Sequence, residues 1–268
     1  MWIALIGAVL IGLSLGLLGS GGSILTVPVL VYLVGEPDKI AIAESLGIVG
    51  AIAAAGALPY ARQRTIDWRS VLFFGIPGII GTYGGAWLSR FVSGPVQLSL
   101  FAVVMLLAAV LMYRRSQPAL PVVRAAAGGL EASRRHAAWK IMLEGLSVGV
   151  LTGLVGVGGG FLIVPALVLL GGLDMRQAVG TSLVIIALKS FAGYLKYLEV
   201  LAELGLSVHW ETVGLFAAVG IAGSFAGNWI GGRIPQHHLQ RGFAVFLVAM
   251  GLWILYQNIE AFTGSIAN

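Results

Sequence analysis

The chain has 268 residues, of which 58% are hydrophobic and only 10% are charged, and its mean hydropathy is +0.96. Because a soluble domain carries about 25% charged residues, this composition excludes a water-facing globular domain and predicts an all-α polytopic membrane protein. The absence of cysteine excludes disulfides, thiolate metal sites and a cysteine nucleophile. The net charge of +5 is not arranged as a basic stripe interleaved with aromatic residues, so we expect no nucleic-acid partner.

The first apolar segment, Ile3–Val34, is too long for one comfortable crossing, because a helix spans the hydrocarbon core in about 20 residues. A glycine-rich cluster at positions 19–22 interrupts the segment, and Pro28 follows the cluster. Residues 1–18 have neither a basic leader nor a small-residue cleavage site, so we expect them to remain in the mature protein.

Six later segments have the length and composition of single crossings. They are Ile40–Ala61, Ser70–Phe91, Leu98–Tyr113, Gln177–Tyr197, Thr212–Gly231 and Arg241–Gln257. Between the third and fourth, Arg114–Lys140 carries six Lys or Arg residues against one acid, and we interpret it as a cytoplasmic linker. Ile141–Leu170 then repeats the long, glycine-interrupted pattern. We therefore divide the chain into a first membrane repeat at 1–113, a linker at 114–140 and a second membrane repeat at 141–268.

The two halves match one another in sequence, which indicates an internal repeat. An offset of 137 residues pairs Pro28 with Pro165, Gly35 with Gly172, Ser45 with Ser182, Leu46 with Leu183 and Gly56 with Gly193. An offset of 142 then pairs Trp68 with Trp210, Gly78 with Gly220, Gly81 with Gly223, Gly85 with Gly227 and Trp87 with Trp229. The alternative, chance similarity between two apolar sequences, does not explain so many matches in so few registers.

Loop charges predict that the two halves have opposite orientations in the bilayer. The loop Arg62–Arg69 carries three arginines and is assigned to the cytoplasm, whereas its repeat equivalent, Glu199–Glu211, carries three acids and no Lys or Arg. Inversion requires an odd number of crossings in each half. Three single crossings satisfy this only if each glycine-interrupted segment turns back as a helical hairpin, so we expect both termini outside.

A broken helix at equivalent positions of two inverted repeats is typical of a substrate site near the membrane midplane. The half-helices that follow the breaks would direct free N–H groups and the positive ends of their dipoles inward, an arrangement that suits an anion. The predicted site residues at the breaks are Gly19, Ser20, Gly21, Gly22 and Ser23 in the first half, and Gly156, Gly158, Gly159 and Gly160 in the second. The alternative is that these glycines serve only tight helix packing.

Lys189 lies in the middle of an expected crossing, where an ionisable side chain is a functional candidate by default. Helical spacing places it on one face with Ser182, and we predict that its ammonium group binds the anion. A structural lysine that pairs with a carboxylate, or that extends to the interface, is the alternative.

Hydroxyls near the starts of two crossings complete the predicted site. Ser45, Thr181 and Ser182 are candidate ligand contacts, with helix capping or back-bonding as the alternative. Glu44, the repeat equivalent of Thr181, is a candidate proton-coupling group, and an interfacial carboxylate is the alternative. His237 and His238 lack matching ligands elsewhere in the sequence, so we expect no metal site there and no cofactor.

The paired glycine-rich segments resemble those of the TauE/SafE sulfite exporter family, as do Ala178–Leu183 (AVGTSL) and the loop Ile66–Arg69 (IDWR). The resemblance covers all of the chain except the linker. It implies a secondary transporter or permease that moves sulfite, an organosulfonate, thiosulfate or a related sulfur-containing anion across the cytoplasmic (inner) membrane. Lys189 departs from the neutral polar residue expected at this position.

Three other functions are weighed against this one. A passive anion channel is the main alternative, and no residue pattern separates it from a transporter. No catalytic triad, pair of intramembrane aspartates or nucleotide-binding motif supports an enzyme, and a cation carrier would need more buried acids than this chain offers. A homo-oligomer is left open.

Overall fold

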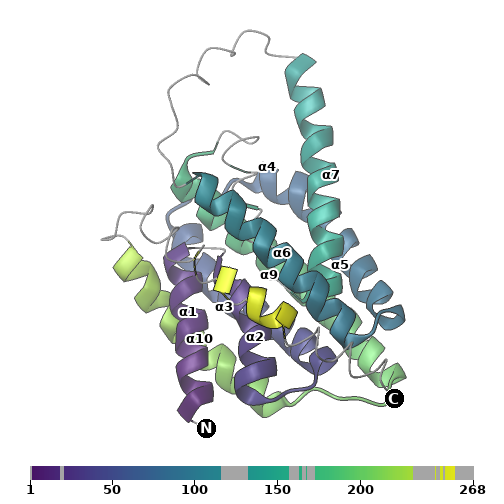
Figure 1. Ribbon diagram of the computed structural model, residues 1–268. Helices are drawn as coiled ribbons and strands as arrows, with labels where there is room; N and C mark the ends of the chain where they lie inside the picture. The colour runs from purple at the N-terminus through teal and green to yellow at the C-terminus, as the bar shows by residue number, and fades with distance from the viewer. Residues whose placement is uncertain are drawn as a thin grey trace.

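The fold was obtained as a computed structural model, and all of the regular elements that it describes are helical (Figure 1). The described residues are 2–18, 21–115, 132–156, 163–164, 167, 173–231, 245, 248–249 and 251–256. The first half contains α1 (Trp2–Leu18), η1 (Gly21–Leu25), α2 (Thr26–Pro28), η2 (Val29–Val34), α3 (Asp38–Arg62), α4 (Trp68–Ser70), η3 (Val71–Gly75), α5 (Ile76–Leu88), η4 (Ser89–Phe91) and α6 (Gly94–Arg115). The second half contains α7 (Ala132–Val155), α9 (Met175–Glu203) and α10 (Trp210–Gly231).

Five of the six expected single crossings coincide with described helices, and four stretches are long and apolar enough to cross a membrane. These four are Asp38–Arg62, Trp68–Phe91, Arg176–Glu203 and Trp210–Ile230. The sixth segment, Arg241–Gln257, is described only in part, at 245, 248–249 and 251–256. Residues 116–131 of the expected linker also lie outside them, and α7 begins within the remainder of that stretch. The predicted class, an all-α polytopic membrane protein, is confirmed.

The described parts of the first glycine-interrupted segment pack against each other, as the two arms of the expected helical hairpin would. Helix α1 ends at Leu18, and the chain resumes as helix at Gly21. A Cβ atom built on Gly7 would lie 2.5 Å from Cγ1 of Val29, so the chain after the break runs back along α1. Gly35 then ends η2 in the left-handed region with φ +84°, and α3 begins at Asp38.

Helices α3 and α9 pack against each other in the interior, and the two halves exchange contacts around this pair (Figure 1). Helix α5 of the first half packs along α7 of the second, and α10 of the second half packs along α1 of the first. Under the sequence offsets α1 corresponds to α7 and α5 to α10, so the two contacts are equivalent. Corresponding helices therefore occupy corresponding places around the central pair.

Glycines allow the α5–α7 contact to be close. A Cβ atom on Gly81 would lie 2.9 Å from the Val150 nitrogen and 3.1 Å from Cα of Gly149. Its repeat counterpart, Gly223, lies at the equivalent α10–α1 contact. Glycines therefore serve tight helix packing at Gly81 and Gly223, which are separate from the glycines at the two breaks.

We expect Gly81→Ala to destabilise the protein by about 1–3 kcal/mol, because the added methyl group meets backbone atoms that cannot move aside. Gly84, one turn along on the same helix, has open space around its Cβ position, so Gly84→Ala is the matched control. The measurement is the melting temperature of each purified variant. Equal melting temperatures for the two variants would contradict the close packing described here.

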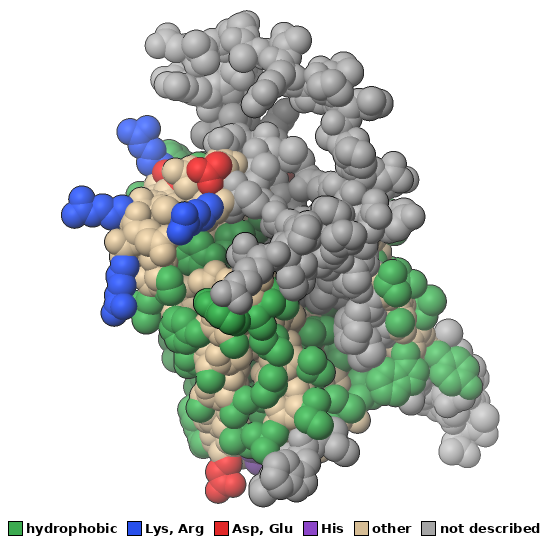
Figure 2. All heavy atoms as spheres, turned by 90° about the vertical axis from the view of Figure 1, so that its left-hand side faces the viewer, with side chains coloured by type: hydrophobic (Ala, Val, Ile, Leu, Met, Phe, Trp, Pro, Cys, Tyr) green, Lys and Arg blue, Asp and Glu red, His purple; other side chains and the backbone are tan. Residues whose placement is uncertain are grey.

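The two ends of the molecule differ in charge, and an apolar band separates them (Figure 2). One end exposes the arginines of the α3–α4 connection and of the start of α9: Arg62, Arg64, Arg69 and Arg176. The opposite end exposes Glu203, His209 and Glu211. Helix α6 begins beside Asp38, near the acidic end, so it runs toward the arginine end before the expected linker. Large apolar side chains such as Leu72, Ile80 and Leu195 are exposed on the helices.

Candidate functional site

The glycine break at the end of α7 is described at Gly156, which has φ +76°. A Cβ atom there would lie 2.6 Å from Cγ2 of Ile42 and 2.9 Å from its carbonyl oxygen, so both the backbone conformation and the available space require glycine. The Ser45 hydroxyl lies 2.6 Å from the Gly156 carbonyl oxygen and 2.7 Å from the Ile42 carbonyl oxygen. Two of the predicted site residues, Ser45 and Gly156, are therefore in contact.

The end of α7 is held by two further polar side chains that the sequence analysis missed. The Leu154 carbonyl oxygen accepts hydrogen bonds from Gln97 Nε2 at 2.7 Å and from the Tyr197 hydroxyl at 3.2 Å. Both side chains are fully buried, Gln97 on α6 and Tyr197 on α9. A helix end inside the protein needs such partners, because its last carbonyl groups have none within the helix. A buried amide in an apolar helix is the signal that would have pointed to Gln97.

Lys189 is fully buried, and its Nζ lies 3.3 Å from the Thr152 hydroxyl on α7. Thr152 is one turn before Gly156, and its own hydroxyl donates to the Val148 carbonyl at 2.7 Å. The Phe74 ring lies farther away, with its centroid 6.0 Å from Nζ. Among the described residues, no carboxylate forms an ion pair with Lys189. The lysine therefore reaches the same end of α7 as Ser45, without a counter-charge from the described chain.

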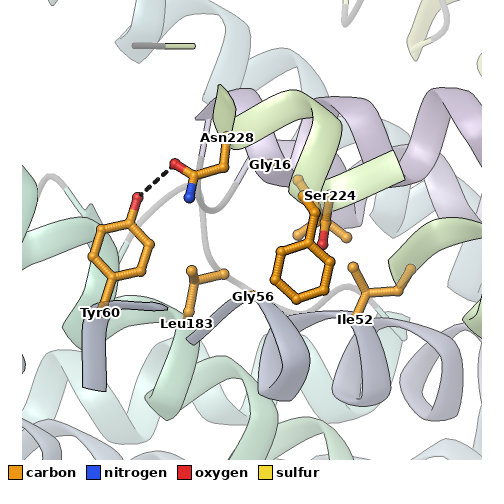
Figure 3. Close-up of a pocket in the computed structure, with 9 residues that line it drawn as sticks. Gly16, Ile52, Gly56, Tyr60, Leu183, Ser224 and Asn228 are labelled. Carbon is orange, nitrogen blue, oxygen red and sulfur yellow. Dashed lines mark hydrogen bonds between the residues drawn. The ribbon is translucent and has the colours of Figure 1, made fainter. Parts of the chain in front are cut away.

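The positions equivalent to Lys189 and Thr152 carry apolar residues in the first half. Lys189 and Thr152 correspond to Ile52 and Leu15 under the offset of 137, and both of those side chains are buried. They line a small pocket between α1, α3, α9 and α10, together with Tyr60, Ser224 and Asn228 among others (Figure 3). The Tyr60 hydroxyl donates to Asn228 Oδ1 at 3.3 Å. None of the lining residues is charged, so this pocket is a weaker candidate for anion binding than the end of α7.

Thr181 and Glu44, which are equivalent in the repeat, make equivalent contacts. Thr181 Oγ1 accepts a hydrogen bond from the Asp67 backbone N–H at 2.9 Å, and Glu44 Oε1 accepts one from the His209 backbone N–H at 2.7 Å. Asp67 and His209 correspond under the offset of 142. Each central helix thus anchors the loop that precedes α4 or α10. Proton coupling by Glu44 stays a prediction.

The remaining predicted residues divide between described and undescribed positions. The Ser182 hydroxyl donates to the Val179 carbonyl of its own helix at 2.8 Å, which is the back-bonding alternative. Ser23 is fully buried, within the short helix η1 that begins at Gly21 and includes Gly22. Gly19, Ser20, Gly158, Gly159 and Gly160 lie outside the described residues. A ligand role for the predicted set stays a prediction.

The helices, apolar band and buried polar interior define a multi-pass membrane protein. Residues 4–254 match the model of the sulfite exporter TauE/SafE family, and the chain belongs to that family. It is 31% identical over 256 residues to the "Probable membrane transporter protein" of Xylella fastidiosa strain Temecula1, covering 93% of this chain and 92% of that protein. It is 27% identical to the "Probable membrane transporter protein YunE" of Bacillus subtilis, covering 94% of this chain and 97% of YunE. The protein is a membrane transporter. No solved structure matches the chain.

Proposed function

We propose that this protein is a secondary transporter that moves a small sulfur-containing anion, and that the anion binds beside Lys189 at the end of α7. The observation that carries the proposal is a fully buried lysine without a carboxylate partner among the described residues. An ammonium group taken out of water without a counter-charge costs several kcal/mol, and a bound anion supplies that counter-charge. The family description, which names sulfite, is the reason for choosing sulfur-containing anions.

The donors that remain unused at this site favour Lys189 as the main anion contact. An ammonium group has three N–H donors, and the described contacts use one of them, toward Thr152. The single proton of the Ser45 hydroxyl is shared between two carbonyl oxygens, and that of Ser182 is donated within its helix. In this conformation the hydroxyls of Ser45 and Ser182 therefore hold backbone carbonyl groups, whereas Lys189 has N–H donors available for a ligand.

A ligand screen tests the proposal on the purified wild-type protein. Sulfite, sulfate, thiosulfate, sulfonates and carboxylates would each be added while the melting temperature is measured, because a ligand that binds only the folded state raises it. We expect a concentration-dependent rise with at least one sulfur-containing anion and a smaller rise with carboxylates. A rise with carboxylates alone would overturn the proposed substrate class, and no rise with any anion would overturn the anion site.

We also propose that the arginine end faces the cytoplasm and that the two halves are inverted. Single cysteines at Gly35 and Glu203 should then be labelled by an impermeant maleimide from outside intact cells, while a cysteine at Arg64 should react only after permeabilisation. All three positions are exposed, and the wild-type chain has no cysteine to interfere. Labelling of the Glu203 position only from the cytoplasm would contradict the inverted arrangement.

A further inference from the structure

Three side chains with metal-ligating atoms converge at the acidic end of the molecule. Both carboxylate oxygens of Glu36 lie near His209 Nδ1, at 3.0 and 2.9 Å. Glu44 Oε1 lies 3.6 Å from the same nitrogen. One candidate ligand atom from each of the three residues lies within 4.8 Å of the other two. The cluster joins the start of the central helix α3 to the loop between α9 and α10.

Anchoring of that loop does not explain the cluster, because the other half anchors its equivalent loop without one. In that half the neutral hydroxyl of Thr181 accepts a hydrogen bond from the Asp67 N–H, whose equivalent, the His209 N–H, donates to Glu44. The counterparts of Glu36 and His209 are Leu173 and Asp67 under the two offsets. A hydroxyl would therefore be sufficient at position 44, and the two carboxylates and the imidazole require another reason.

A second observation, independent of the cluster geometry, concerns the Glu44 carboxylate. Its side chain is fully buried, and its Oε2 atom has no hydrogen-bond partner among the described residues. A buried carboxylate oxygen without a partner is costly, so it indicates a ligand at this point. The cluster also has an entry path, because 55% of the His209 side chain is exposed to solvent while Glu36 is nearly covered.

We propose that Glu36, Glu44 and His209 bind a divalent cation of the zinc type. Imidazole nitrogen with carboxylate oxygen is a donor set that suits zinc, whereas calcium and magnesium prefer oxygen alone. In a tetrahedral zinc site, ligand atoms about 2.0–2.2 Å from the metal lie about 3.3–3.6 Å from one another. The distance from His209 Nδ1 to Glu36 Oε2, 2.9 Å, is shorter than this range, and the distance to Glu44 Oε1, 3.6 Å, lies at its upper end, so a small adjustment of the Glu36 side chain would admit the ion. Three protein ligands leave one position for water, which the exposed side of His209 admits.

Zinc titration of the purified, tag-free protein by isothermal calorimetry tests this site. We expect one site per chain in the wild type, and binding at least about tenfold weaker in Glu36→Gln, Glu44→Gln and His209→Ala. Glu44→Gln is the sharpest variant, because its amide oxygen can still accept the His209 N–H while the charge is lost. Glu211→Gln removes an exposed acid two residues from His209 and is the matched control, with unchanged affinity.

The other three histidines of the chain are kept in every variant, so binding by them would persist when His209 is replaced. Zinc affinity that is unchanged in both His209→Ala and Glu44→Gln would overturn the proposal, as would the absence of a site in the wild type. If a variant does not fold, the proposal is tested by the melting temperature of the wild-type protein, measured with zinc and with magnesium. The proposed site predicts a rise with zinc and no rise with magnesium, and equal responses to both ions would contradict it.

Discussion

Lys189→Ala is expected to weaken anion binding by roughly ten- to hundredfold, which corresponds to the loss of a charged hydrogen bond of about 1.5–3 kcal/mol. The lysine is buried, and its Nζ lies near a hydroxyl and an aromatic ring among the described residues, so the bound anion would lose its nearest positive charge in this variant. The measurement is the anion dependence of the melting temperature, followed by calorimetry with the anion that raises it most. Lys196→Ala, on the same helix and paired with Glu199 at the surface, is the control.

Two further substitutions at this position separate charge from shape. Lys189→Arg should restore binding only in part, because a planar guanidinium is larger than an ammonium group and the lysine stem is already closely packed. A Cβ atom on neighbouring Gly78 would lie 2.9 Å from Cδ of Lys189, which shows how little space remains. Lys189→Glu should bind least, because it adds repulsion. Unchanged anion affinity in a well-folded Lys189→Ala protein would remove the lysine from the site.

Gly156→Ala is expected to abolish transport and to lower the melting temperature. Its φ of +76° costs an L-residue about 1–3 kcal/mol, and the new methyl group would meet Ile42, on α3. Relief of that contact must move the α7 end away from Ser45, which holds its carbonyl group. Transport in proteoliposomes and the melting temperature measure the two effects.

Gly205→Ala separates backbone strain from contact. Gly205 has a similar φ of +69°, but its Cβ position has open space around it. We therefore expect this variant to be destabilised only by the strain of its backbone conformation and to transport normally. If the two variants behave alike, positive φ alone accounts for the loss, and the contact between Gly156 and α3 has no part in it.

The sequence was sufficient to predict the helices of five of the six expected crossings and the first break, because both depend on local composition. An apolar run of about 20 residues must be helical in a bilayer, where every backbone N–H and C=O has to be paired within the segment. The positions of Asp38–Arg62 and Trp210–Gly231 agree with the predicted segments to within two residues at each end. Gly156, predicted to lie at the second break, directly follows the end of α7 and has φ +76°, whereas its predicted role in substrate binding stays a prediction.

The partners of the site residues could not be predicted, because they come from distant parts of the chain. Gln97 and Tyr197 are 100 residues apart, yet both hold the Leu154 carbonyl group. The sequence analysis placed Lys189 on one face with Ser182 but gave no indication of Thr152, on another helix. Likewise, Glu44 was considered alone, since nothing in its own segment indicates His209, 165 residues later.

The central claim, that the protein is a transporter for a sulfur-containing anion, is tested most directly by uptake into proteoliposomes. Wild-type protein and Lys189→Ala would be compared with empty liposomes, at increasing concentrations of the anion that raises the melting temperature most. The proposed function predicts uptake that saturates with concentration in the wild type and falls by at least about tenfold in Lys189→Ala at low concentration. Uptake that rises without saturation would indicate a channel, and sulfur-anion uptake no greater than in empty liposomes would contradict the proposed function.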